Sequence, residues 1–105
     1  MSEIITRFAP SPTGNLHIGG IRTALINYIF TKKAELENKN SKFLLRIENT
    51  DKLRSSVTYE KSIIESLKWL DINWNDKIYK QSDSIDKHIL IAKKLLNTKG
   101  AYKCI

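Results

Sequence analysis

The sequence predicts an α/β domain in which parallel strands alternate with helices. An apolar, strand-like run ends in a Pro/Gly turn that leads into a long helix-like segment, and a second strand-like run follows. A strand, a crossover helix and a second strand form a right-handed parallel unit, so the pattern indicates the opening half of a doubly wound sheet. A ligand is then expected at the carboxyl ends of the strands.

The first half of the chain is expected to contain two strands and one long helix. Residues 3–8 are predicted as a buried strand, which ends where two prolines remove backbone donors and fix a turn. Residues 17–38 are predicted as a helix because apolar side chains recur at helical spacing. Those side chains are Ile18, Ile21, Leu25 and Ile29. After a polar connection, residues 42–48 are predicted as the second strand.

The second half is expected to contain two helices and a short strand. Residues 58–70 carry apolar side chains on one side of a helix. A third helix is predicted to begin with Ser82 or Asp83 as its N-cap and to end with Gly100 as its C′ residue. Residues 101–105 are predicted as a strand. The two tryptophans, Trp69 and Trp74, are expected in the core or at its rim.

Composition limits the class of protein. The 105 residues allow one small domain at most, and the 41% that are hydrophobic are enough for a core. The formal charge of +7 favours an anionic partner such as nucleic acid or nucleotide phosphate, and a lysine-rich solvated surface explains it about equally well. No apolar run has the length of a membrane span or the form of a signal sequence, so we expect no membrane partner and a cytoplasmic location. All four arginines lie in the first 54 residues: Arg7, Arg22, Arg46 and Arg54. Arginine is well suited to bind carboxylate and phosphate because its guanidinium group can form two parallel hydrogen bonds to them.

The most specific motif is the segment from Pro10 to Gly20, Pro-Ser-Pro-Thr-Gly-Asn-Leu-His-Ile-Gly-Gly. A strand, a tight turn and a helix start present backbone N–H groups to phosphate, and His17 adds a side-chain donor there. The segment resembles the HIGH signature of class I aminoacyl-tRNA synthetases, in the glutamyl-tRNA synthetase version, in which the final His is replaced by Gly. The stretch Phe43-Leu-Leu-Arg-Ile-Glu-Asn-Thr-Asp51 resembles a second part of that family. Further matches follow in order at residues 67–70, 79–82 and 100–104.

The resemblance covers essentially the whole chain and implies both a fold and a function. Residues 1–105 are expected to be the N-terminal half of the class I catalytic, nucleotide-binding domain, a truncated Rossmann-like doubly wound parallel sheet. The implied activity is that of a glutamate–tRNA ligase, which activates glutamate with ATP and transfers it to tRNA. ATP is expected as its Mg²⁺ complex, and L-glutamate and tRNA(Glu) are the other partners of the full-length enzyme.

Residues for ATP follow from the first motif. Negative charge builds on the α-phosphate when a carboxylate attacks it, so donors fixed near that phosphate are the main catalytic device. The resemblance places Thr13 and His17 beside the phosphates as catalytic groups, and it assigns Gly19 and Gly20 with them to ATP binding. The alternative for His17 is a histidine at a helix N-terminus that is satisfied locally.

Residues for glutamate lie at the ends of the two strands. The Arg7 fork can take a carboxylate, Ser11 can add a hydroxyl donor, and Glu48 can accept from the α-ammonium. The resemblance assigns Arg7, Ala9, Ser11 and Glu48 to the amino-acid site. The alternative is that Arg7 and Glu48 simply pair with each other.

Two positions depart from the family pattern. Asn49 stands where the family usually has an acidic residue, so it either supports the loop or changes the charge next to the site. Thr50, Asp51 and Arg54 are expected to stabilise that loop. Cys104 stands where some glutamyl-tRNA synthetases begin a zinc site with Cys-x-Cys. A single thiolate cannot form a four-ligand site, so a small buried residue is favoured and no metal site is expected.

The family's second ATP motif, the KMSKS loop, has no counterpart in these residues. We therefore expect an N-terminal fragment, a split product whose partner is the rest of the synthetase, or a truncated paralogue, inactive by itself and with an exposed sheet edge. Three alternatives remain open. One is a paralogue that glutamylates a modified base in a tRNA, and another is a non-catalytic protein that binds nucleotide, amino acid or RNA. The third is an unrelated basic α/β domain, which the ordered set of motifs disfavours.

Overall fold

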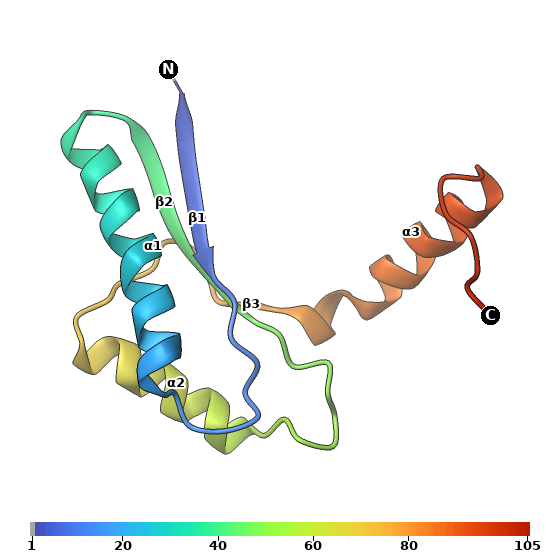
Figure 1. The fold of residues 1–105 in the computed structure, drawn as a ribbon, viewed down its shortest axis with the longest axis horizontal. Helices are drawn as coiled ribbons and strands as arrows, with labels where there is room; N and C mark the ends of the chain where they lie inside the picture. The colour runs from blue at the N-terminus through green and yellow to red at the C-terminus, as the bar shows by residue number, and fades with distance from the viewer. Residues whose placement is uncertain (1) are drawn as a thin grey trace.

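The computed structural model describes residues 2–105. Three parallel strands form a sheet in the order β1-β2-β3, helices α1 and α2 lie against one side of it, and α3 extends away from it (Figure 1). The elements are β1 (Glu3–Phe8), α1 (Ile18–Leu36), β2 (Asn40–Ile47), α2 (Val57–Trp69), β3 (Tyr79–Lys80), a 3₁₀ turn η1 (Gln81–Ser84) and α3 (Ile85–Asn97). The bounds of the four expected elements of residues 3–70 are thus confirmed to within two residues. The expectation that residues 3–8 form a buried strand is wrong, because β1 is an edge strand and Phe8 is its one buried side chain.

β1 and β2 form the predicted parallel unit around α1. Their register runs from Glu3 opposite Asn40 to Phe8 opposite Leu45, so both strands end at the same edge of the sheet. Side chains alternate between the two faces of a strand. On β2 this alternation buries Phe43, Leu45 and Ile47 on the face that meets the helices.

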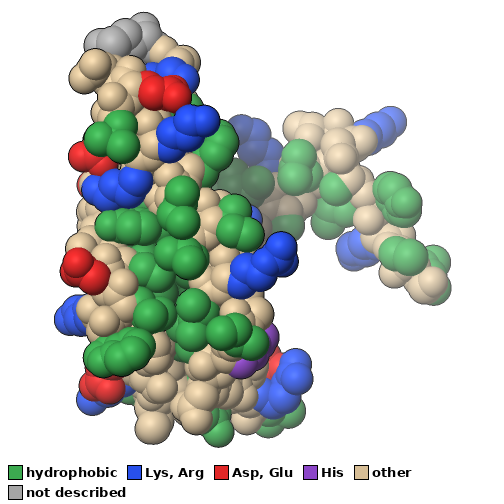
Figure 2. All heavy atoms as spheres, turned by 60° about the vertical axis from the view of Figure 1, so that its left-hand side comes forward, with side chains coloured by type: hydrophobic (Ala, Val, Ile, Leu, Met, Phe, Trp, Pro, Cys, Tyr) green, Lys and Arg blue, Asp and Glu red, His purple; other side chains and the backbone are tan. Residues whose placement is uncertain are grey.

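The core lies between that face and the two helices. Ala24 from α1 and Ile63 and Leu67 from α2 pack against the buried strand residues, and Ile72 closes the cluster behind α2. The outward side of α1 is apolar but uncovered: Leu25, Ile26, Ile29 and Phe30 are all exposed. Exposed hydrophobic side chains also form a column along the face of the molecule that Figure 2 shows. The expected exposed sheet edge is also present among the described residues, since β1 pairs with β2 on one side only.

All three α-helices end in a left-handed residue that is not glycine. Asn38, Asp71 and Lys99 have φ values of 59°, 58° and 59°. In each case the N–H of the left-handed residue and the N–H of the residue after it donate to carbonyl groups of the last turn, as from Ile72 to Leu67 O at 2.9 Å and from Gly100 to Leu95 O at 2.9 Å. The prediction that Gly100 is the C′ residue of the third helix is therefore wrong, because Lys99 occupies that position.

Other predictions for the C-terminal third are also wrong. Residues 101–105 form no strand, because they follow a helix that projects away from the sheet. The third strand is instead Tyr79–Lys80, which pairs with the end of β2. Neither Ser82 nor Asp83 caps α3, since the chain enters it through η1 and the N-cap is Ser84. Trp69 is 85% exposed, whereas Trp74 packs against the core as expected.

In residues 2–105, no helix has both the length and the apolarity that crossing a membrane requires.

Candidate nucleotide and amino-acid site

The Pro/Gly turn after β1 is held by backbone bonds from two other segments. The N–H of Glu48 donates to Pro10 O at 2.9 Å, and the N–H of Ser56 donates to Pro12 O at 3.1 Å. Because neither proline has a backbone N–H, the turn takes part in these contacts through its carbonyl groups. The turn is thereby fixed between the end of β2 and the start of α2, and Pro12 is fully buried.

His17 is the N-cap of α1. Its Nδ1 accepts a hydrogen bond from the N–H of Gly19 at 3.1 Å, and its backbone has the extended conformation of a cap. A neutral imidazole that accepts at Nδ1 carries its proton on Nε2, so the outer nitrogen is a donor. The alternative in which His17 is satisfied by local hydrogen bonds therefore accounts for Nδ1 only, and Nε2 is available to a ligand.

The two glycines after His17 have different neighbours. A Cβ added at Gly19 would lie 3.0 Å from Cε1 of His17, so the missing side chain leaves room for the imidazole ring. A Cβ added at Gly20 would lie 2.8 Å from Cδ1 of Leu16. Both glycines therefore have a packing reason at the start of α1, independent of any nucleotide.

A cavity of about 260 Å³ lies beside this helix start. It brings together Ser11, Thr13, His17 and Gly20, with apolar walls that include Phe8 and Ile63. Of the residues expected to bind ATP, only Gly19 is outside its lining. Arg7, Ala9 and Glu48, three of the four expected to bind glutamate, are also outside this lining.

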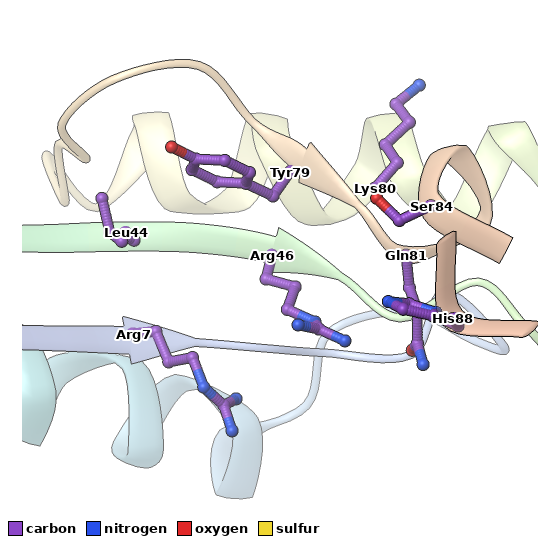
Figure 3. Close-up of a pocket in the computed structure, with 8 residues that line it drawn as sticks. All are labelled: Arg7, Leu44, Arg46, Tyr79, Lys80, Gln81, Ser84 and His88. Carbon is purple, nitrogen blue, oxygen red and sulfur yellow. The ribbon is translucent and has the colours of Figure 1, made fainter. Parts of the chain in front are cut away.

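A second cavity, of about 250 Å³, opens on the other face of the sheet. Arg7 is opposite Leu44 in the register, so it shares this face with Leu44 and with Arg46 two residues on. Figure 3 shows both guanidinium groups extending to the same side, while Lys80 points away from them. The remaining lining residues are Tyr79, Gln81, Ser84 and His88. The sequence analysis did not assign Arg46 to a site. Its place between the apolar residues Leu45 and Ile47 does indicate that it lies on the face of β2 opposite the core.

Glu48 lies next to Arg46, not in a pair with Arg7. Its Oε1 is 3.6 Å from Arg46 Nε, an ion pair without a hydrogen bond, and both side chains are about one-third exposed. Within residues 2–105 the buried Nε of Arg46 has no hydrogen-bond partner. The alternative in which Arg7 and Glu48 neutralise each other is therefore not what the structure contains.

The loop after β2 is stabilised by two of the three residues predicted to do so, Asp51 and Arg54. Arg54 Nε donates to Asp51 Oδ2 at 2.6 Å and its backbone N–H donates to Oδ1 at 3.2 Å. These hydrogen bonds from Arg54 hold the pKa of Asp51 below its usual range. Thr50 is exposed at the start of this loop.

Two polar contacts join this region to the segment around β3. Asn49 exchanges two hydrogen bonds with Ser82, at 2.8 and 3.0 Å, which agrees with the first of its two alternatives, support of the loop. Glu60, nearly buried on α2, accepts from Lys80 Nζ at 2.6 Å. The hydrogen bond and charge of Glu60 raise the pKa of Lys80. Sequence reasoning missed both contacts because they join residues far apart in the chain.

Cys104 is exposed near the end of the chain, so the expectation of a buried side chain is wrong. The physical reason is that residues 101–105 have no strand or core to pack against. The residues that the structure describes contain no group of three or more His, Cys, Asp or Glu side chains placed to hold a metal ion.

The family described as tRNA synthetases class I (E and Q), catalytic domain, matches residues 3–105. The chain belongs to this synthetase family. A glutamate–tRNA ligase of Orientia tsutsugamushi is 54% identical over 104 residues, which are 99% of this chain and 21% of that protein. One of Pelagibacter ubique is 52% identical with the same coverage. The chain thus spans about a fifth of the length of these synthetase relatives.

Solved structures of the synthetase family have the same fold. A glutamate tRNA ligase from Elizabethkingia meningosepticum, in complex with its amino acid, has a TM-score of 0.79 and 37% identity, covering 90% of this chain and 19% of that one. A glutamate–tRNA synthetase from Elizabethkingia anophelis has a TM-score of 0.81 and 36% identity, covering 91% and 20%. The predicted α/β fold of the class I, Rossmann-like type and the resemblance to glutamyl-tRNA synthetases are both confirmed.

Proposed function

We propose that this chain carries the ATP- and glutamate-binding part of a glutamate–tRNA ligase. The reaction is the ATP-dependent activation of glutamate to glutamyl-adenylate, followed by transfer to tRNA. The main observation in support of the proposal is that Thr13 and His17 both line one cavity beside the start of α1. The names of the relatives, glutamate–tRNA ligases at about 50% identity, support the choice of glutamate.

ATP would bind with its phosphates at the start of α1. The N–H groups and dipole of a helix N-terminus favour negative charge, and the outer nitrogen of His17 adds a neutral donor. The Thr13 hydroxyl can donate from the turn. These donors are held before ATP arrives, so they can stabilise the charge that develops on the α-phosphate during attack. Magnesium would enter as part of the nucleotide complex. Gly19 and Gly20 would keep the backbone open to the adenosine.

Glutamate would lie at the ends of β1 and β2. Arg7 offers a guanidinium fork to a carboxylate, and Glu48 offers an acceptor to the ammonium. Ser11 and the backbone at Ala9 would complete the site from the turn. The N–H of Glu48 bonds to Pro10 O, which ties the glutamate residues to the same turn that carries Thr13. The two substrates would therefore meet across residues 9–13.

We further propose that residues 1–105 bind these two substrates without transferring glutamate to tRNA by themselves. The chain spans about a fifth of the length of its relatives, and no counterpart of the KMSKS loop stands in its sequence. Detectable glutamylation of tRNA by the purified 105-residue chain would overturn this second proposal and leave the first intact.

Calorimetric titration of the chain with a non-hydrolysable glutamyl-adenylate analogue tests the first proposal. The aspartyl analogue, one methylene shorter, is the matched control. We expect the glutamyl analogue to bind more tightly, because Arg7 on β1 and Glu48, which follows the end of β2, are held at a set separation. Equal binding of the two analogues, or binding of neither, would contradict the proposed function.

A further inference from the structure

We infer that Arg46 is a further residue of the amino-acid site and holds the α-carboxylate of the bound glutamate. The inference rests on the proposed function and concerns a side chain that neither the motifs nor the comparisons assign. It starts from the second cavity, where two guanidinium groups from neighbouring strands share one space of about 250 Å³.

The positive side chains that line this cavity face no carboxylate within its lining, and Glu48, which is 3.6 Å from Arg46, lies outside that lining. The cavity is lined by Arg7, Arg46 and Lys80, and no carboxylate lines it. Lys80 is already bound to Glu60 at 2.6 Å and points away from the two arginines (Figure 3). Arg7 and Arg46 are therefore the two cations that a ligand would meet.

Arg46 also has a donor without an acceptor. Its Nε is buried, and among the described residues it makes no hydrogen bond; the nearest carboxylate oxygen, on Glu48, is 3.6 Å away. A buried donor without an acceptor is costly, so it is a strong reason to expect a bound anion at that atom. Arginine suits this role because its fork matches the two oxygens of a carboxylate.

The charges of glutamate match the three groups one by one. Glutamate carries two carboxylates and one ammonium, and the site offers Arg7, Arg46 and Glu48. In an α-amino acid the ammonium and the α-carboxylate are attached to the same carbon, so the groups that receive them must be adjacent. Glu48, which would receive the ammonium, lies next to Arg46. The α-carboxylate is thereby assigned to Arg46, and the side-chain carboxylate is left for Arg7.

The function of Arg46 follows from that assignment. The α-carboxylate is the group that attacks the α-phosphate of ATP, and the rate of attack depends on its orientation. An arginine that holds this carboxylate from the end of β2 would fix its direction relative to the turn that carries Thr13. Arg46 would thus bind the α-carboxylate, which glutamate and glutamine share, and would not distinguish one amino acid from the other.

The test compares three ligands on two proteins by calorimetric titration. The ligands are glutamate, isoglutamine, whose α-carboxylate is an amide, and glutamine, whose side-chain carboxylate is an amide. The proteins are the 105-residue chain and its Arg46→Gln variant. We expect the variant to bind glutamate about tenfold more weakly and glutamine weaker by a similar factor, with isoglutamine nearly unchanged.

Controls separate this inference from the proposed function and from misfolding. Arg22→Gln, a change on the exposed face of α1 outside the cavity, should leave all three affinities unchanged. Arg46→Lys keeps the charge without the fork, so it should give an intermediate loss and decides the matter if Arg46→Gln does not fold. A loss for isoglutamine but not for glutamine, or no loss for glutamate, would overturn the role of Arg46. Failure of the unaltered chain to bind glutamate would instead overturn the proposed site.

Discussion

Asn49 and Ser82 are joined by two hydrogen bonds: Asn49 Nδ2 donates to Ser82 Oγ at 2.8 Å, and the N–H of Ser82 donates to Asn49 Oδ1 at 3.0 Å. The pair connects the loop after β2 to the start of η1. Asn49 follows Glu48 directly, and Ser82 follows Gln81, which lines the cavity of Arg7 and Arg46. One side chain therefore fixes the position of two segments that border the proposed glutamate site.

Replacing Asn49 with Ala should destabilise the chain by about 1–2 kcal/mol, because it removes both bonds and leaves a half-buried N–H without an acceptor. Asn49→Asp should cost much less, since a carboxylate can accept from both the N–H and the hydroxyl of Ser82. Urea unfolding of the two variants measures the difference. Equal losses for Asp and Ala at this position would show that the contact contributes little.

His17→Asn should separate the capping role of His17 from its proposed role with ATP. Asparagine is a good N-cap, so this variant should keep the stability of α1, whereas His17→Ala should lose about 1 kcal/mol. Both variants lack the outer ring donor and should bind ATP roughly tenfold more weakly. Thermal unfolding and nucleotide titration are the two measurements. If His17→Asn bound ATP like the unaltered chain, His17 would be a cap only.

The Glu60–Lys80 pair should give a stability term that disappears at high pH. Its contacts raise the pKa of Lys80 above its usual 10.5, so the stabilisation is fully present below that pH and is lost as pH rises through the raised value. Lys80→Met should cost about 1 kcal/mol or less near neutral pH, because Lys80 is 42% exposed. Unfolding of both proteins from pH 8 to 12 should show this difference shrinking above pH 10.5.

Lys61→Met is the control for the Lys80→Met experiment. Lys61 is exposed on α2, the helix that carries Glu60, and it makes no ion pair within residues 2–105. Its difference from the unaltered chain should stay near zero across the pH range. A Lys80→Met difference that stayed constant to pH 12 would mean that Lys80 stabilises by packing and not by charge.

Asp71→Gly should stabilise the chain by about 0.5 kcal/mol. Asp71 ends α2 at φ 58°, a conformation that costs a residue with a Cβ more than it costs glycine, although glycine also gives the unfolded chain more freedom. Asp71→Ala keeps the Cβ and removes the polar side chain that tolerates this region, so it should be less stable than the unaltered chain. The order Gly, Asp, Ala in urea midpoints is the expected result, and the reverse order would contradict it.

Local sequence patterns were sufficient for the first 70 residues. Apolar periods of two and of about four distinguish β1 and β2 from α1 and α2, and the packing of Phe43, Leu45 and Ile47 agrees with that local preference. The strand at Tyr79–Lys80 could not be predicted in this way. It has two residues, and it exists only because the chain returns to the free side of β2.

The candidate site was predictable where one motif carries it. Thr13, His17 and Gly20 are close in sequence and meet at one cavity. The cavity of Arg7 and Arg46 depends on the register of two strands, and the bonds of Asn49 and Glu60 reach segments that only the tertiary fold brings near. Gly100 was misjudged because glycine is the common residue at a helix end, whereas this chain uses Asn, Asp and Lys there.

The most direct test of a joint ATP and glutamate site is an NMR map of the 105-residue chain with the non-hydrolysable glutamyl-adenylate analogue. We predict that the amide signals that shift belong to residues 7–20 and 46–49, while those of residues 89–97 on α3 stay in place. Shifts concentrated on α3, or no shifts at saturating analogue, would contradict the account.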